Sequence, residues 1–210
     1  MILPRLYPIL DTGTLALRNC DVIAAAAAML AGGARILQFR HKGHYSREVF
    51  GAAEKVAELC RRAGSLCIID DRADIAVLLD AGVHVGQDDL PPSDARRLIG
   101  PGRLLGFSTH NEAQLRAAGS EPADYIAVGP IFGTTSKEKP DPVVGIEELH
   151  RLRALETRPL VAIGGITREN ALAVLEAGAD SVAVIGDLLP AECNFESMRE
   201  RMEQWQKLVK

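Results

Sequence analysis

Residues 160–185 read LVAIGGITRENALAVLEAGADSVAVI, and they contain one complete copy of the unit from which the chain is built. Two short apolar runs, residues 160–163 and 181–185, have the length and the β-branched content of buried strands. Between them, residues 168–177 have helical spacing, and Thr167 is a suitable N-cap. A short strand, a helix and a second strand in this order predict a parallel β-α-β unit.

The same unit recurs along the whole chain, about every 25 residues. Eight units of this kind predict a (β/α)8 barrel, the TIM-barrel fold, as a single domain over residues 1–210, since no linker-like tract divides the chain. An open doubly wound sheet is the alternative, weakened because no G-x-G-x-x-G follows the first strand. The predicted strands cover residues 6–10, 34–39, 66–69, 83–85, 104–107, 125–128, 160–163 and 181–185.

Composition narrows the possible partners. The 210 residues carry a formal net charge of −4 with only 4% aromatic residues, which gives no reason to expect nucleic acid as a partner. The apolar stretch 22–31 is too short for a membrane span, and no basic segment or cleavage site precedes or follows it as in a signal peptide. We therefore expect no membrane association and a cytoplasmic location.

The cysteines are consistent with that location. Cys20, Cys60, Cys67 and Cys193 include no Cys-x-x-Cys pair and no zinc-like spacing with histidine. We expect four reduced, mostly buried thiols.

Unusual polar residues follow the predicted strands, at the end of a barrel where active sites lie. Gln38, Arg40 and Lys42 alternate along an extended segment, so their side chains point to one side. Two cations and an amide in one barrel mouth would suit an anionic substrate, although surface charges at a strand end are the alternative. Asp71 and Asp89 end neighbouring strands, and they could either ligate magnesium or form salt bridges with nearby cations.

Glycines mark a second anion site. Gly164 and Gly165 form a turn that we expect to lead directly into the helix at 168–177, and Gly186 ends the next strand. Backbone N–H groups at such a turn favour phosphate, and the loops after strands 7 and 8 are the usual phosphate site of the barrel. The long loop 129–142 is either a lid, closing Lys137 over a phosphate, or a mobile surface loop.

Together these residues indicate a magnesium-assisted transferase that joins two phosphorylated molecules, one of which loses diphosphate. His84 lies within a predicted strand and is expected to be a hydrogen-bonded core histidine. No Ser/His/Asp or Cys/His arrangement indicates a covalent nucleophile.

An ordered series of motifs resembles the thiamine-phosphate synthase family over nearly the whole chain. The motifs are LQFRHK (37–42), IDDRAD (69–74), GVHVGQDDLP (82–91), GFSTH (106–110), GPIFGTTSK (129–137) and VAIGGI (161–166). The resemblance implies small-molecule substrates and leaves homo-oligomerisation open.

The resemblance also implies a role for individual residues. Hydroxymethylpyrimidine diphosphate would be bound near Asp70, and Asp71 and Asp89 would hold Mg²⁺ on its diphosphate. Diphosphate would leave the pyrimidine methylene before the thiazole nitrogen attacks, so the protein would mainly position the reactants and neutralise charge. The diphosphate would contact Gln38, Arg40, Lys42, Ser108 and Lys137, and the thiazole phosphate would contact Thr134, Ser136, Gly165, Ile185 and Gly186.

Three positions depart from the pattern of the family. Asp70 replaces the usual Asn, and this additional carboxylate should repel diphosphate unless it is protonated, pairs with a cation or recruits metal. Ser136 replaces Thr but keeps the hydroxyl, and Gly186 stands where Ser is common.

Two other functions remain as alternatives. A thiazole tautomerase of the same superfamily would have His in place of Pro130, and it would lack residues of the diphosphate site. A non-catalytic, phosphate-sensing regulatory homologue would be expected to lose the metal carboxylates first.

Overall fold

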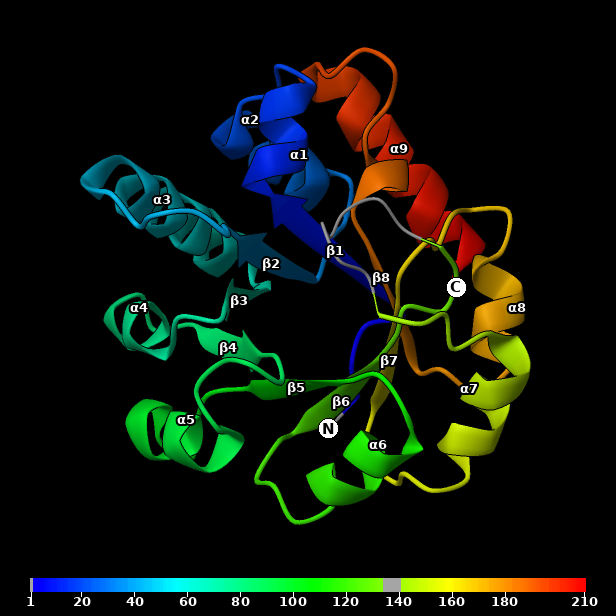
Figure 1. Ribbon diagram of the computed structural model, residues 1–210. Helices are drawn as coiled ribbons and strands as arrows, with labels where there is room; N and C mark the ends of the chain where they lie inside the picture. The colour runs from blue at the N-terminus through cyan, green and yellow to red at the C-terminus, as the bar shows by residue number, and fades with distance from the viewer. Residues whose placement is uncertain (1, 134–140) are drawn as a thin grey trace.

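A computed structural model describes residues 2–133 and 141–210, and within them eight parallel strands form a closed barrel. The strands follow one another around the barrel in sequence order, and β1 pairs with β8 to close it (Figure 1). The predicted barrel is confirmed, and the open doubly wound sheet is wrong. The strands are β1 (Leu6–Asp11), β2 (Ile36–Arg40), β3 (Leu66–Asp70), β4 (Gly82–Val85), β5 (Leu105–Thr109), β6 (Tyr125–Val128), β7 (Leu160–Ile163) and β8 (Ser181–Val184).

Helices surround the barrel, and among the described residues none is long and apolar enough to cross a membrane. The last helix packs against α2, next to the seam between β1 and β8 (Figure 1). The helices are α1 (Thr12–Leu17), α2 (Val22–Ala31), α3 (Arg47–Ala63), α4 (Ala73–Leu78), α5 (Pro92–Ile99), α6 (Glu112–Ala118), α7 (Ile146–Arg153), α8 (Ala171–Glu176), the 3₁₀ turn η1 (Gly186–Leu188) and α9 (Phe195–Leu208).

Alternating strand residues build two apolar layers, because successive side chains point into the barrel or out toward the helices. The inner layer includes Tyr7, Ile68 and Tyr125, and the outer layer lies between the strands and the helices. Trp205 of α9 is completely buried in the outer layer. The filled interior leaves the mouth of the barrel as the place for a site.

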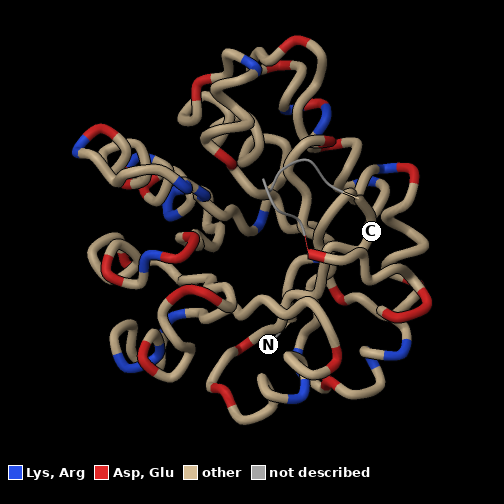
Figure 2. The backbone as a smooth tube through the Cα atoms, viewed as in Figure 1, with Lys and Arg blue, Asp and Glu red and all other residues tan. Residues whose placement is uncertain are grey.

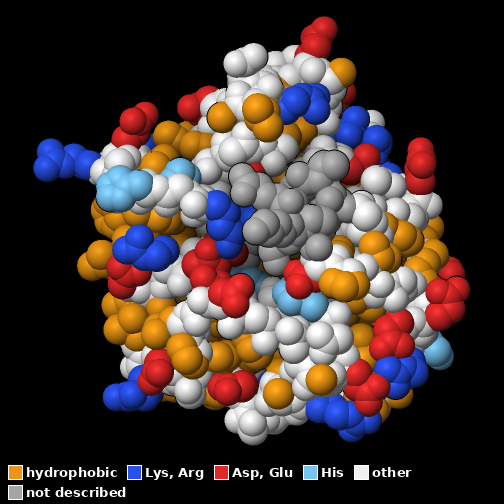
Figure 3. All heavy atoms as spheres, viewed as in Figure 1, with side chains coloured by type: hydrophobic (Ala, Val, Ile, Leu, Met, Phe, Trp, Pro, Cys, Tyr) orange, Lys and Arg blue, Asp and Glu red, His pale blue; other side chains and the backbone are white. Residues whose placement is uncertain are grey.

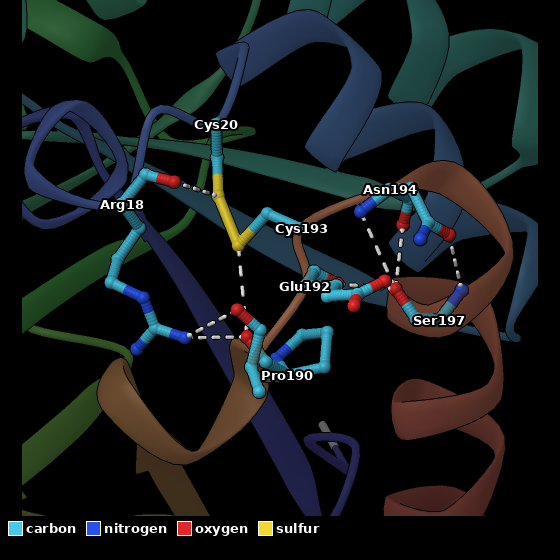
Figure 4. The surroundings of a disulfide bond; sticks show 8 residues. Arg18, Cys20, Pro190, Glu192, Cys193, Asn194 and Ser197 are labelled. Atoms are coloured by element: carbon cyan, nitrogen blue, oxygen red, sulfur yellow. Dashed lines mark hydrogen bonds between the residues drawn. A yellow bond between two sulfur atoms is a disulfide. The ribbon is translucent and has the colours of Figure 1, made fainter.

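A disulfide joins two segments near the ends of the chain and corrects the expectation of four thiols. Cys20, after α1, is bonded to Cys193, before α9, with 5.6 Å between their Cα atoms (Figure 4). A hydrogen bond from the Arg18 guanidinium to the Pro190 carbonyl lies beside it. Barrel closure brings together residues 173 positions apart, which no local spacing reveals. Cys60 and Cys67 are free thiols, as expected.

Candidate active site

A cavity of about 460 Å³ opens at the carboxyl ends of the strands. Basic, acidic and histidine side chains gather around a hollow at the centre of this face (Figure 3). The cavity is lined by all the predicted site residues that the structure describes, namely Gln38, Arg40, Lys42, Asp70, Asp71, Asp89, Ser108, Gly165, Ile185 and Gly186. Thr134, Ser136 and Lys137 lie outside the described residues.

The two cations at the end of β2 face this cavity and are held by carboxylates. Arg40 forms an ion pair with Asp11, and its Nε lies 3.6 Å from Asp70 Oδ2. Lys42 Nζ lies 2.9 Å from the same Asp70 oxygen and also pairs with Asp71. The predicted orientation of these side chains to one side of the segment is therefore confirmed.

Asp71 and Asp89 lie in direct contact. Asp71 has a left-handed backbone (φ 61°), and its N–H donates to the His84 carbonyl at 2.8 Å. Asp89 accepts a hydrogen bond from the Gly86 N–H at 2.8 Å. Burial raises the pKa of Asp89, and the adjacent Asp71 carboxyl raises it further. Two adjacent carboxylates repel each other unless a proton or a cation lies between them, so this pair fits a hard divalent cation.

Asp70 is buried beside that pair, with 5% of its surface exposed. Burial raises its pKa, whereas Lys42 and Arg40 oppose that rise without cancelling it. Of the three ways in which this carboxylate could be accommodated, the structure provides the pairing with cations.

A polar chain runs from the cavity into the barrel interior. Ser108 Oγ lies 2.8 Å from His84 Nε2, and His84 Nδ1 lies 3.1 Å from the Tyr125 hydroxyl, which meets the Tyr7 hydroxyl at 2.7 Å. Burial lowers the pKa of His84 to about 4, so the imidazole is neutral at pH 7. The expectation of a hydrogen-bonded core histidine is confirmed, and His84 also orients Ser108 and lines the cavity.

Backbone groups form the opposite side of the cavity. The N–H groups of Gly165 and Gly186 donate to no other residue in the described part of the chain. Gly165 has φ 64°, and a Cβ there would lie 2.6 Å from the Gly133 carbonyl oxygen. With no acceptor among the described residues, these two amides are available to bind an anion between β7 and β8.

The helix after this turn begins later than predicted. α8 starts at Ala171, and Asn170, not Thr167, is its N-cap residue. The Asn170 side chain accepts from the Thr167 N–H at 2.8 Å and donates to the Gly165 carbonyl at 3.0 Å. These bonds stabilise an additional turn, so the anion site depends on the loop amides more than on the helix end.

Two further residues at the mouth of the barrel were not in the predicted set. Asp11 holds Arg40 from the end of β1. His110 lines the cavity, and its Nδ1–H donates to the Gly129 carbonyl at 2.6 Å. Both residues end or directly follow strands, and that position was the sequence signal that could have identified them.

Comparison with known proteins agrees with this geometry. The family model described as Thiamine monophosphate synthase matches residues 6–188. The thiamine-phosphate synthase of Koribacter versatilis is 47% identical over 190 residues, which cover 89% of this chain and 90% of that protein. The thiamine-phosphate synthase of Myxococcus xanthus is 41% identical over 206 residues, covering 98% and 94%.

A solved structure gives the same result. Thiamine phosphate pyrophosphorylase from Pyrococcus furiosus superposes with a TM-score of 0.83 at 30% identity, covering 98% of this chain and 95% of that one. The fold, the cavity and these similarities agree, and the chain belongs to the thiamine monophosphate synthase family.

Proposed function

We propose that this chain is a thiamine-phosphate synthase, a transferase that condenses hydroxymethylpyrimidine diphosphate with hydroxyethylthiazole phosphate. The products are thiamine monophosphate and diphosphate. One observation carries the proposal: cations, paired carboxylates and free backbone amides line a single cavity, on opposite sides of it. Such a cavity offers two different anion sites, one for each substrate.

The diphosphate is assigned to the β2–β4 side of the cavity. Arg40 and Lys42 supply positive charge there, and Gln38 and Ser108 supply uncharged hydrogen-bonding groups. Neutral His84 keeps Ser108 in place through a 2.8 Å contact. Lys137 belongs to the same set in the family pattern and is proposed to approach the diphosphate as well.

Asp71 and Asp89 are the residues that would hold Mg²⁺. Within the described residues no group of three or more acidic, histidine or cysteine side chains is arranged as a metal site. Magnesium, however, often takes only one or two protein carboxylates and fills its remaining positions with water and substrate phosphate. When bound, it would stabilise the charge that develops on the leaving diphosphate.

The thiazole phosphate is assigned to the amides of Gly165 and Gly186, with Thr134 and Ser136 as further partners. These amides can satisfy the phosphate oxygens by hydrogen bonds without adding a counter-charge. Gly186 has no side chain, so the contact that a Ser would make at this position is absent and the backbone contact remains.

The reaction needs no protein nucleophile. The bond between the pyrimidine methylene carbon and the diphosphate oxygen breaks, and its electron pair leaves with the diphosphate. The thiazole nitrogen then donates its lone pair to the methylene carbon. The residues of the chain hold the two substrates in line and neutralise the leaving group, which is where catalysis by positioning and electrostatics acts.

We also propose a cellular location for the reaction and a domain organisation for the chain. Both substrates carry multiple negative charges and do not cross a bilayer unaided, so we place the reaction in the cytoplasm, within a single catalytic domain. The tautomerase alternative loses support because position 130 is Pro, which lines the cavity, and because Asp71 and Asp89 are both present.

The test is diphosphate release by the purified protein, measured with each substrate alone and with both, with and without magnesium. Release that requires both substrates and magnesium is the expected result. Thiazole phosphate binding without any diphosphate release would contradict the proposal and favour the tautomerase or the regulatory homologue.

A further inference from the structure

Asp11 is a buried carboxylate at the mouth of the barrel for which the reaction described above has no role. It is the last residue of β1 and is 7% exposed. In the parallel pairing of β1 with β2 its register partner is Arg40. Adjacent strand ends therefore place a buried anion directly beside a cation that faces the substrate cavity.

The two oxygens of Asp11 make different contacts. Oδ1 accepts from the Thr14 N–H at 2.7 Å and from the Thr14 hydroxyl at 2.6 Å, and so caps the first turn of α1. Oδ2 accepts from Arg40 Nη1. The capping bonds fix the carboxylate to the backbone of α1, so the oxygen that faces Arg40 has little freedom to move.

Arg40 has a second, weaker anionic neighbour. Its Nε lies 3.6 Å from Asp70 Oδ2, an oxygen that already pairs with Lys42 at 2.9 Å. Without Asp11, the guanidinium would be drawn toward Asp70 and would compete with Lys42 for it. Asp11 therefore sets the position of Arg40 and, indirectly, keeps Lys42 and Arg40 apart.

We propose that Asp11 is a positioning residue, which holds the Arg40 guanidinium in the orientation that receives the diphosphate of the pyrimidine substrate. The inference rests on the proposed function and adds to it a residue that itself touches no substrate. It predicts that the loss of Asp11 weakens the diphosphate side of the cavity and leaves the thiazole phosphate side intact.

The test is the Asp11→Asn variant. Asn is as good an N-cap as Asp, so the capping of α1 is retained, while the charge that holds Arg40 is removed. The Kd for inorganic diphosphate with magnesium, measured by calorimetry, should rise about tenfold, and kcat/KM for the pyrimidine diphosphate should fall by a similar factor. The KM for thiazole phosphate should stay within about twofold.

Asp21→Asn is the matched control. Asp21 is the N-cap of the next helix, α2, where it accepts from the Ile23 and Ala24 N–H groups at 3.0 and 2.8 Å. It forms no ion pair within residues 2–133 and 141–210, so the same substitution there should change neither affinity. A double variant completes the test: in an Arg40→Met background, Asp11→Asn should have no further effect on diphosphate affinity.

Each remaining outcome would overturn the inference. Unchanged diphosphate affinity in Asp11→Asn would show that Arg40 is positioned without Asp11, and tighter binding would show that Asp11 competes with the substrate. Equal losses toward both substrates, or an additive effect with Arg40→Met, would indicate general structural damage. Calorimetry with diphosphate needs no turnover, so failure of the proposed synthase activity in the wild type would be recognised separately.

Discussion

The two sides of the cavity bind anions by different means. On the β2–β4 side, ionisable side chains lie in contact, and every described cation there is paired with a carboxylate. On the β7–β8 side, the groups available for binding are the backbone amides of Gly165 and Gly186. Figure 2 shows that Lys and Arg positions and Asp and Glu positions both occur all around the barrel.

This difference determines how each side responds to change. The charged side depends on the balance between like and opposite charges, so it should respond to the removal of a charge and to pH. The amide side depends on backbone geometry, so it should tolerate pH changes and respond to the addition of a Cβ where the backbone leaves no room.

The largest effect is expected from the paired carboxylates. Asp71→Ala and Asp89→Ala should each lower the magnesium-dependent rate of diphosphate release by about 100-fold or more, without unfolding the protein. Glu54→Ala, which removes an exposed carboxylate on α3 that does not line the cavity, is the control and should change the rate little. Wild-type rates in both variants would remove the assignment of these residues to metal.

The next largest effect is expected in the pH dependence of stability, and it comes from His84, which lies beneath the charged side of the cavity. Its pKa is lowered to about 4, so the unfolded chain takes up a proton near pH 6.5 before the folded chain does. Stability is therefore fully present above pH 6.5 and is lost as the pH falls toward 4. Between pH 7 and pH 5 the free energy of unfolding in urea should fall by about 2 kcal/mol.

The variant His84→Asn lacks this titration and supplies the comparison. The substitution changes the free energy of unfolding at every pH, so the slope of that free energy between pH 5 and pH 7 is the quantity to compare. An equal slope in both proteins would show that groups other than His84 cause the loss.

On the amide side, Gly165→Ala tests the geometry of the backbone. An alanine at this position would have to adopt a backbone φ of 64°. Its Cβ would lie 2.6 Å from the Gly133 carbonyl oxygen and 2.7 Å from Phe132 Cβ. Strain of this kind costs about 1–3 kcal/mol, so we expect the KM for thiazole phosphate to rise about tenfold or more. The affinity for diphosphate should remain near that of the wild type. An equal loss of affinity for both substrates would show that the charged side and the amide side of the cavity are not independent.

The smallest effect is expected at the other amide. A Cβ added at Gly186 would have no heavy atom of the described residues within 4 Å, apart from Gly186 itself and its chain neighbours. Gly186→Ser should therefore keep the KM for thiazole phosphate within about threefold, and a decrease would show that the hydroxyl adds a contact. A tenfold increase would mean that this amide requires glycine.

Much of this arrangement could be predicted from the sequence. The repeat of strand and helix patterns indicates the barrel, and the position of polar residues directly after the strands indicates the site. The strand runs gave the barrel, and strand ends gave Arg40, Asp71 and Ser108 at its mouth. Asp11 was missed because its role arises from the register of two strands, which a single strand does not reveal.

Two other features could not be predicted from the local sequence pattern. Thr167 is a suitable cap by residue type and accepts a hydrogen bond from the Glu169 N–H at 3.3 Å, but residues 168–170 form a turn and α8 begins only at Ala171. The pairing of Cys20 with Cys193 depends on closure of the whole barrel. The start of α8 and the pairing of the two cysteines both depend on contacts in the folded chain, which composition and spacing do not determine.

That disulfide has a mechanical consequence. Cys20 and Cys193 close a covalent ring that contains β2 to β8, while β1 and α9 lie outside it. Tension applied between the two termini would pass through the sulfur–sulfur bond, so it would detach β1 and α9 and leave the ring unstretched. Reduction of the bond under load would then release about 600 Å of chain in addition, a length set by the 173 positions between the two cysteines.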